Sequence, residues 1–513
     1  MAAAAPTGRP EGGVPTPAGS RRPDILVVIL DCGRADDLPG GANPIPRMPF
    51  ADGLYRESLS FPNAVAPSPW TIPSHAGLFT GLYPWESGAH LKQSLILDPA
   101  IPTLAGLLTA SGYGSFAASA NGFLSPTFGL LNGFEAAVWG DWWERFLHLP
   151  TNDRPPWGYN TGPTLKLPKG TYWKLLEEPA KLANRRPILL DILNRFTSQL
   201  VAPGDSYSPY VGPWIEAATE RWLGAQPKEK PVFCFVNYYE AHEPYIIDPS
   251  RVEGGLSYRR LAQLRMDRTN LLAGRWQPKP GEFRDLRRLS RAVIQSLDDR
   301  LRRLCGAFER AGRWDNTIVV LASDHGQAFG EHGFLFHGVR LWEPVVRIPL
   351  WIRFPDGRHR GERGVGWASL IDVMPTLLDA AGVPRPHLPS ASSLLELVDR
   401  PRFGPVMAMS DGTPARKALA KMVPREVWEP WDVAHYAAYS DGRKLILNAA
   451  SGVTQLYELS RDPEESHDLG PSVPSELAPL SDLLRQNASS VSHGKVEARP
   501  QELDDRLKSW GYE

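Results

Sequence analysis

The stretch Asp24–Asp31, DILVVILD, is a continuous apolar run that ends in a carboxylate. Such a run is typical of a central parallel strand that is buried on both faces, and ligands of open α/β sheets bind at the carboxyl ends of such strands. Similar apolar runs follow at Tyr113–Ser119, Pro231–Tyr238, Asn316–Ser323 and Val346–Ile352. The sequence therefore predicts an α/β fold with a doubly wound, mostly parallel central sheet and helices on both faces.

Helical and alternating patterns lie between and after these runs. Pro102–Gly112 and Phe283–Gly312 have helical spacing, and the second is a charged amphipathic helix. After about Pro401 the pattern changes: Tyr436–Leu447 and Thr454–Leu459 alternate like antiparallel strands, and the segment 475–486 indicates a helix. We predict a disordered tail at 1–22, a catalytic domain at 23–400, a smaller C-terminal α+β subdomain at 401–490 and a polar tail at 491–513.

A segment rich in Trp, Pro and Gly, from about Val138 to Trp222, interrupts the alternation of strands and helices. It contains one predicted helix, Pro187–Val201. The segment is either a set of surface excursions or an insertion that shapes a substrate pocket, because binding residues concentrate in loops on a rigid scaffold.

The net charge, the cysteine count and the distribution of apolar residues limit which kinds of protein this chain can be. The 513 residues carry a net charge of −1, which gives no electrostatic footprint for nucleic acid or an anionic membrane. The three cysteines are too few for a disulfide scaffold and fit a reducing compartment; Cys32 and Cys234 are interpreted as small hydrophobes in or beside apolar runs. There is no export signal and no window with the roughly 18 apolar residues of a membrane span, so we expect a soluble, cytoplasmic protein.

The stretch SPWTIPSHAGLFTGLYP, at 68–84, places Thr71 in a proline-rich turn directly before a helix. Pro73 suits the first turn of that helix, Ser74 is predicted to cap it, and Gly81 to end it. A nucleophile at this position has backbone N–H groups and a helix dipole directed at the anion that it attacks. By itself the stretch is weak evidence, because many helices begin at Pro-Ser turns.

Three distant segments bring further polar side chains to predicted strand ends. Two carboxylates, an imidazole and a hydroxyl form a reasonable divalent metal site: Asp31, Asp324, His325 and Thr71. The metal would favour the Thr71 alkoxide and polarise a substrate oxygen. Three more imidazoles could bind the other oxygens of the anion or protonate the leaving group: His75, His242 and His337. Each residue alone is readily explained by a structural role, such as capping, a turn or a hydrogen bond, but together they indicate an active site.

The chain resembles the sulfatase family of the alkaline phosphatase superfamily. The resemblance rests on ILVVILDCGRAD, TIPSHAGLFTGLYP, NYYEAHEPY, SDHGQAFGEHGFLFHG with RLWEPVVRIPL, and LYELSRDPEESHDLG. It extends from about Asp24 to Gly470, apart from the Trp-rich segment, and implies an alkaline phosphatase-like fold, a bound divalent metal and ester hydrolysis.

The sequence departs from the sulfatase pattern at the positions that matter most. Sulfatases have Cys or Ser in C/S-x-P-S-R, oxidised to formylglycine; here the pentad begins with Thr71, which cannot give the aldehyde, and ends with His75. The usual second Asp of the first motif is Cys32, and the usual late Asp-Asn is Asp324-His325. These replacements favour Mn²⁺ or Zn²⁺ over Ca²⁺ or Mg²⁺. They resemble the Thr-dependent phosphodiesterases, phosphonate monoester hydrolases and phosphoglycerol transferases of the superfamily.

We therefore expect a metal-dependent hydrolase that cleaves a phosphate or phosphonate ester, with a phosphodiester favoured, through a covalent Thr71 intermediate. Three alternatives stay open: a sulfuric ester hydrolase without formylglycine, a phosphotransferase, and a catalytically silent relative that binds an anionic ligand or a partner. One metal ion is expected. A second is left open because the three additional imidazoles could help to bind it, which would shift the preference toward phosphate monoesters. The partner is a small anionic ester; the sequence does not determine its alcohol portion or the oligomeric state.

Overall fold

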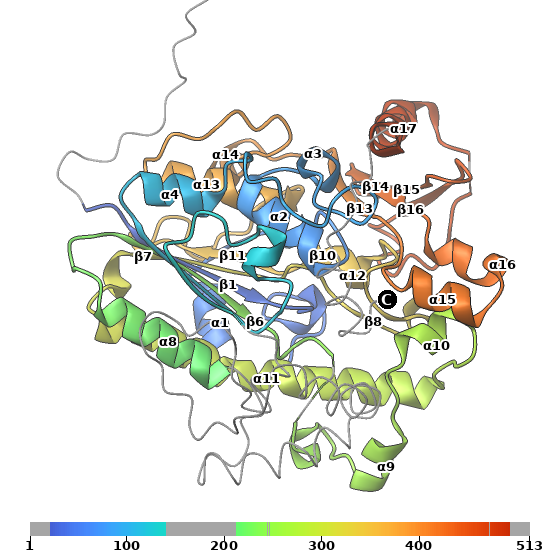
Figure 1. The fold of residues 1–513 in the computed structure, drawn as a ribbon, viewed down its shortest axis with the longest axis horizontal. Helices are drawn as coiled ribbons and strands as arrows, with labels where there is room; N and C mark the ends of the chain where they lie inside the picture. The colour runs from blue at the N-terminus through green and yellow to red at the C-terminus, as the bar shows by residue number, and fades with distance from the viewer. Residues whose placement is uncertain (1–20, 140–211, 244, 246, 471, 493–513) are drawn as a thin grey trace, which may run out of the picture.

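The computed structural model describes residues 21–139, 212–243, 245, 247–470 and 472–492. Within this part of the chain an α/β layer structure carries a smaller antiparallel sheet at one end (Figure 1). The predicted terminal tails, apart from their inner ends, the predicted helix Pro187–Val201 and most of the Trp-rich segment lie outside the described residues.

The central sheet has seven strands, and its core is parallel. In spatial order they are β2 (Leu59–Ser60), β11 (Leu350–Arg353), β7 (Thr317–Ala322), β1 (Asp24–Leu30), β6 (Val232–Tyr238), β4 (Gly114–Ser119) and β5 (Ala136–Trp139). β1 lies between β7 and β6 and is parallel to both, while β11 is antiparallel to β7. The prediction of a mostly parallel sheet is confirmed. Because β1 is buried along its whole length, its sequence is an unbroken apolar run.

Helices cover both faces of this sheet (Figure 1). One face packs against α2 (Thr71–Thr80), α4 (Leu104–Ala110), α13 (Val373–Ala380) and α14 (Leu394–Asp399). The other face packs against α1 (Pro49–Arg56), α8 (Gly212–Gly224) and α11 (Pro280–Arg310). Alternate residues of β1 supply the two faces: Ile25, Val27 and Ile29 on the first, and Leu26, Val28 and Leu30 on the second. This alternation is the strand period of two residues.

The smaller sheet has four antiparallel strands, of which the predicted segments Tyr436–Leu447 and Thr454–Leu459 account for three; the strand at Val406–Ser410 was not predicted. The four strands are β13 (Val406–Ser410), β14 (His435–Ser440), β15 (Arg443–Asn448) and β16 (Thr454–Glu458), and α17 (Ala478–Ser492) packs on the sheet. Among the described residues no helix has the length and apolar character that crossing a membrane requires.

Two features differ from the predictions. The single strand predicted at Val346–Ile352 is two strands in different sheets: β10 (Arg347–Ile348) pairs with β3 (Ala64–Val65), and β11 begins after Pro349. Proline has no N–H to donate to a strand ladder, so the run is interrupted there. In addition, the predicted insertion boundary at Trp222 falls inside α8, whose Trp222 is buried against Phe116 of β4.

A buried carboxylate at the interface between α8 and α11, Glu216, is expected to make stability depend on pH. Burial raises the pKa of Glu216 from its usual 4.5 to about 7, against the opposing charges of Arg300 and Arg303. The folded protein thus holds this proton more tightly than the unfolded chain, and the contribution of Glu216 falls as the pH rises from about 4.5 to about 7. Glu216→Gln should match wild type near pH 4.5 and be more stable by up to about 3 kcal/mol at pH 8. Thermal or urea unfolding measured across this range tests the expectation, which a stability difference independent of pH would contradict.

Candidate active site

Two buried carboxylates emerge at the same edge of the central sheet. Asp31 directly follows β1, and Asp324 follows β7 after Ser323. The two strands are parallel neighbours in which Ile29 lies opposite Ala322, so both chains leave the sheet on the same side. Both carboxyl groups have zero exposure. The strand-end rule therefore predicts correctly that these two residues leave the same edge of the sheet.

The hydroxyl of Thr71 is linked to this pair through Asn121. Thr71 is the first residue of α2 and is 2% exposed. Asn121 Nδ2 donates to Asp31 Oδ2 at 2.7 Å and lies 3.4 Å from Thr71 Oγ1. Trp70 at the N-cap is held by Asp411, whose Oδ1 accepts from the indole N–H at 3.0 Å. Threonine and carboxylate are thus fixed by side chains from separate elements.

The prediction that Ser74 caps α2 is wrong. The helix begins at Thr71, one turn earlier than a Ser74 cap would allow, and Trp70 is the N-cap. The Ser74 hydroxyl instead donates to the backbone carbonyl of Asp324 at 2.5 Å. This bond ties the first turn of α2 to the loop that carries the second carboxylate.

The carboxylate site, which we define as Asp31, Thr71, Asp324 and His325, contains buried polar atoms without a hydrogen-bond partner. They are Asp31 Oδ1, Asp324 Oδ2 and His325 Nε2. Asp324 Oδ2 lies 3.3 Å from His325 Nε2, while Asp324 Oδ1 accepts the backbone N–H groups of Cys32 and His325. Unpaired buried polar atoms are costly, and two carboxylate oxygens with an imidazole nitrogen are ordinary ligands of a divalent cation. Ligand atoms of Asp31, His325 and the neighbouring Cys32 all lie within 4.8 Å of one another, so the residues present fit the metal ion that the fold implies.

Burial and mutual repulsion shift the pKa values at this site. Burial, with the nearby charge of Asp324, raises the pKa of Asp31 to about 6, and burial raises that of Asp324 to about 7. Burial lowers the pKa of His325 to about 4. All three shifts express the cost of placing charge here without a counter-ion, which a cation would offset.

The three additional imidazoles do not occupy equivalent positions. His75 has zero exposure, lies against the rings of Phe79 and Phe235, and donates from Nδ1 to the carbonyl of Thr71 at 2.9 Å. Its Nδ1 is 3.6 Å from Asp324 Oδ2, and burial lowers its pKa to about 3. His75 is therefore a neutral side chain behind the carboxylates, which favours a positioning role over direct proton donation.

His242 and His337 lie near His325, and the imidazole rings of these three residues form a group. The centroid of the His337 ring lies 4.9 Å from that of the His242 ring and 4.5 Å from that of the His325 ring. His242 follows β6, and His337 directly follows β9 (Leu335–Phe336). The structure thus brings these two residues next to the carboxylate site.

Sequence reasoning missed several neighbours of these rings. Glu243 Oε2 lies 3.7 Å from the Nδ1 atoms of both His242 and His337, and Arg268 donates to Glu243 Oε1 at 2.9 Å.

Asn121, the residue between Asp31 and Thr71, was also missed. It could have been found by the strand-end rule, because it closely follows β4. Arg268 gave no signal beyond being one of many charged residues.

The interpretation of Cys32 as a small hydrophobe is wrong. Its backbone φ is +63°, an unusual left-handed conformation for a residue with a side chain. The turn places Sγ 3.6 Å from the Nδ1 atoms of both His325 and His337. Cys234, in contrast, packs in the apolar core, as expected.

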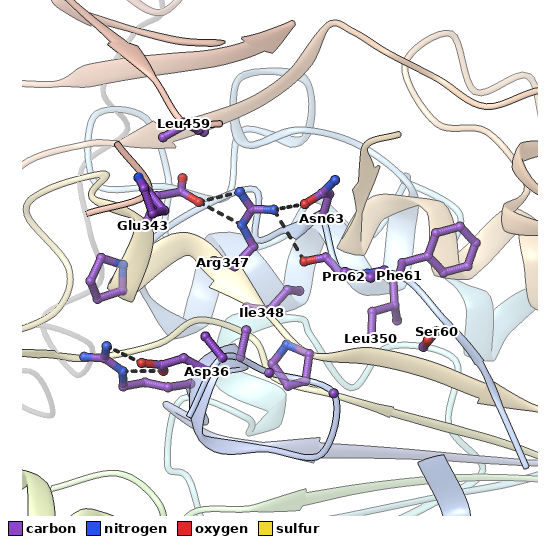
Figure 2. Close-up of a pocket in the computed structure, with 18 of the residues that line it drawn as sticks. Asp36, Ser60, Phe61, Pro62, Asn63, Glu343, Arg347, Ile348, Leu350 and Leu459 are labelled. Atoms are coloured by element: carbon purple, nitrogen blue, oxygen red, sulfur yellow. Dashed lines mark hydrogen bonds and ion pairs between the residues drawn. The ribbon is translucent and has the colours of Figure 1, made fainter. Parts of the chain in front are cut away.

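A separate pocket of about 700 Å³ is lined by none of the carboxylate-site residues. Figure 2 shows Arg347 in this pocket between Glu343 and Asn63, to which it donates at 2.8 and 2.6 Å. The guanidinium groups of Arg34, Arg287 and Arg347, which line this pocket, are all paired with carboxylates, so we place the chemistry at the carboxylate site.

Comparison with known proteins agrees with this geometry. The sulfatase family profile matches residues 23–383. The chain belongs to the sulfatase family. It is an ester hydrolase of the alkaline phosphatase superfamily, and its match spans the elements that carry both carboxylates and Thr71.

Individual relatives of this sulfatase-family chain are named for different activities. Arylsulfatase K from Bos taurus is 26% identical over 499 residues, covering 93% of this chain and 83% of that protein. The multifunctional alkaline phosphatase superfamily protein PehA from Trinickia caryophylli is 26% identical over 416 residues, covering 73% and 76%. A phosphonate monoester hydrolase structure from Agrobacterium radiobacter has a TM-score of 0.62 at 18% identity, covering 93% of this chain and 100% of that one. The last comparison shows a shared fold.

Proposed function

We propose that this protein is a metal-dependent hydrolase of a small, singly charged phosphodiester or phosphonate monoester, with Thr71 as the covalent nucleophile. The observation that carries the proposal is the threonine hydroxyl at the first position of α2, linked by Asn121 to a buried carboxylate pair with unpaired oxygens. A hydroxyl at a helix N-terminus beside such a pair suits attack on an anionic ester.

Different residues of the site would have different roles in the reaction. A divalent ion held by the carboxylate site would polarise a substrate oxygen and favour the ionised form of the Thr71 hydroxyl. Thr71 Oγ1 forms a bond to phosphorus while the bond from phosphorus to the departing alcohol oxygen breaks. His242 and His337 are the candidates to bind the remaining oxygens, and His242 is the candidate to supply a proton to that alcohol. Water then attacks phosphorus, and the bond between phosphorus and Thr71 Oγ1 breaks, which restores the hydroxyl.

The choice of phosphorus over sulfur follows from the nucleophile. A formylglycine hydrate can expel sulfate by collapsing to the aldehyde, without attack of water at sulfur. A threonine ester cannot collapse to an aldehyde in this way, so water must attack its sulfur or phosphorus atom. At phosphorus this step is catalysed mainly by positioning and by neutralising charge. One metal ion beside imidazole hydrogen-bond donors suits a singly charged ester better than a doubly charged monoester.

A sulfuric ester hydrolase without formylglycine is the second candidate, because relatives such as arylsulfatase K carry a sulfatase name. The PehA relative and the phosphonate monoester hydrolase structure support the first candidate. Transfer of the phosphoryl group to an alcohol instead of water would use the same Thr71 ester. A silent binding protein is disfavoured, because the hydroxyl, both carboxylates and His325 are all present at one sheet edge.

A matched substrate panel tests the proposal. Aryl phosphate monoesters, phosphodiesters, phosphonate monoesters and sulfates with one leaving group are assayed with Mn²⁺, Zn²⁺ and Ca²⁺. We expect the highest kcat/KM for the phosphodiester or phosphonate with Mn²⁺ or Zn²⁺. A sulfate turned over faster than the phosphodiester would overturn the assignment in favour of the second candidate.

A further inference from the structure

A second group of potential ligands lies beside the carboxylate site. We name it the thiol cluster and define it as Cys32, His242, Glu243 and His337, whose donor atoms all lie within 4.8 Å of one another. The side chains come from the turn after β1, the loop after β6 and the residue after β9. Cys32, His242 and His337 are at most 5% exposed. Thiolate, imidazole and carboxylate are the ligands that Zn²⁺ takes in proteins.

We propose that the thiol cluster binds a second divalent cation, of the thiol-tolerant kind represented by Zn²⁺ or Co²⁺, next to the ion of the carboxylate site. The inference does not depend on which ester is hydrolysed. With the cluster occupied, His242 and His337 would hold the second ion, and that ion, instead of their N–H groups, would bind the substrate oxygens.

The surroundings of Cys32 distinguish it from the two structural thiols. Cys234 and Cys305 pack in the apolar core between the sheet and the α8–α11 layer. Cys32 has two imidazole nitrogens 3.6 Å from Sγ, and the strained φ of +63° orients its side chain toward them. Strain of this kind concentrates at functional sites. A thiol placed between two imidazoles has the environment of a ligand rather than that of a packing residue.

Outer side chains hold the imidazole and the carboxylate of the cluster. Arg268 Nη2 lies 2.9 Å from Glu243 Oε1 and 3.2 Å from His337 Nε2. Because a guanidinium only donates, His337 Nε2 accepts, and its Nδ1 donates to Gln327 Oε1 at 2.6 Å. The ring is therefore neutral, as a metal-ligating histidine must be, and it exchanges one of these hydrogen bonds for the metal when it ligates. Glu243 retains Oε2, which faces both imidazoles.

Charge balance makes this second ion compatible with a singly charged substrate. Once bound, a dication with one thiolate, one carboxylate and two neutral imidazoles forms a group with no net charge, whereas the empty cluster carries the single negative charge of Glu243. Binding converts the Cys32 thiol to a thiolate and releases its proton to solvent. Binding therefore raises the charge of the cluster by one unit, from −1 to 0, and leaves no net positive charge on the occupied cluster.

Co²⁺ binding to the full-length apoprotein tests the proposal without measuring turnover. We expect two ions per chain, a sulfur-to-cobalt charge-transfer band and release of one proton with the second ion. Cys32→Ser should lose the band and His337→Gln should bind one ion, while Cys305→Ala, which alters a core thiol, should keep both ions and the band. Asp31→Asn should still show the band.

Three results would overturn the second site: one ion per chain in wild type, a band that persists in Cys32→Ser, or two ions retained in both cluster variants. A band with only one ion per chain would place the thiolate on the first ion instead. Because ion number and spectrum are the readouts, failure of this proposal is distinguishable from failure of the proposed hydrolase activity, which the substrate panel measures.

Discussion

Replacing Thr71 by alanine is expected to lower kcat by at least about 10³-fold while leaving the fold intact, because the covalent step has no other hydroxyl at this position. Thr71 begins α2, its backbone position is set by Trp70 and Asp411, and the change removes only a methyl and a hydroxyl group. The measurement is kcat and kcat/KM for a phosphodiester, together with the thermal midpoint of unfolding.

Two further variants make the result specific. Thr71→Ser keeps a hydroxyl and should retain most of the activity. Thr80→Ala changes a buried threonine at the other end of α2, whose Oγ1 donates to the Ala76 carbonyl, and should retain full activity at some cost in stability. Near-normal turnover by Thr71→Ala, with loss in Ser74→Ala, would instead make Ser74 the nucleophile.

Asp324→Asn is expected to remove metal binding at the carboxylate site and to lower kcat/KM by about 10³-fold or more, a typical scale for losing transition-state charge stabilisation. The amide oxygen can still accept the N–H groups of Cys32 and His325, but the unpaired Oδ2 is lost as an anionic ligand. Because burial raises the pKa of Asp324 to about 7, the metal-free variant should be no less stable than metal-free wild type. Metal content after dialysis, kcat/KM and thermal unfolding are the measurements.

The matched control is Asp298→Asn. Asp298 is also a buried carboxylate, but it accepts the N–H groups of Phe50 and Ala51 at the start of α1. This variant should keep its metal and its activity and lose about 1 kcal/mol of stability as a weakened helix cap. Full metal content and activity in Asp324→Asn would remove Asp324 from the metal site.

The elements that could be predicted are those fixed by local chemistry. A strand buried on both faces needs an unbroken apolar run, so β1, β4, β6 and β7 are visible in the sequence. The rule that ligands lie at the carboxyl ends of parallel strands then places Asp31 and Asp324 at the same edge.

The parts that could not be predicted depend on tertiary contacts. The apolar run before Cys32 suggests a buried hydrophobe, but a left-handed turn redirects the thiol toward two imidazoles. The Ser74 hydroxyl finds an acceptor in the Asp324 carbonyl, 250 residues away, rather than in its own helix. Asn121 joins Asp31 to Thr71 only because β4, β6 and β1 lie side by side. None of these three contacts can be predicted from the spacing of residues in the sequence.

The stereochemical course at phosphorus tests the covalent Thr71 intermediate most directly. An aryl phosphorothioate diester that is chiral at phosphorus is hydrolysed in ¹⁸O-labelled water, and the configuration of the product is determined by NMR. Two successive in-line displacements, first by Thr71 and then by water, give net retention, which is the predicted result. Net inversion would mean that water attacks the substrate directly, and would contradict the account.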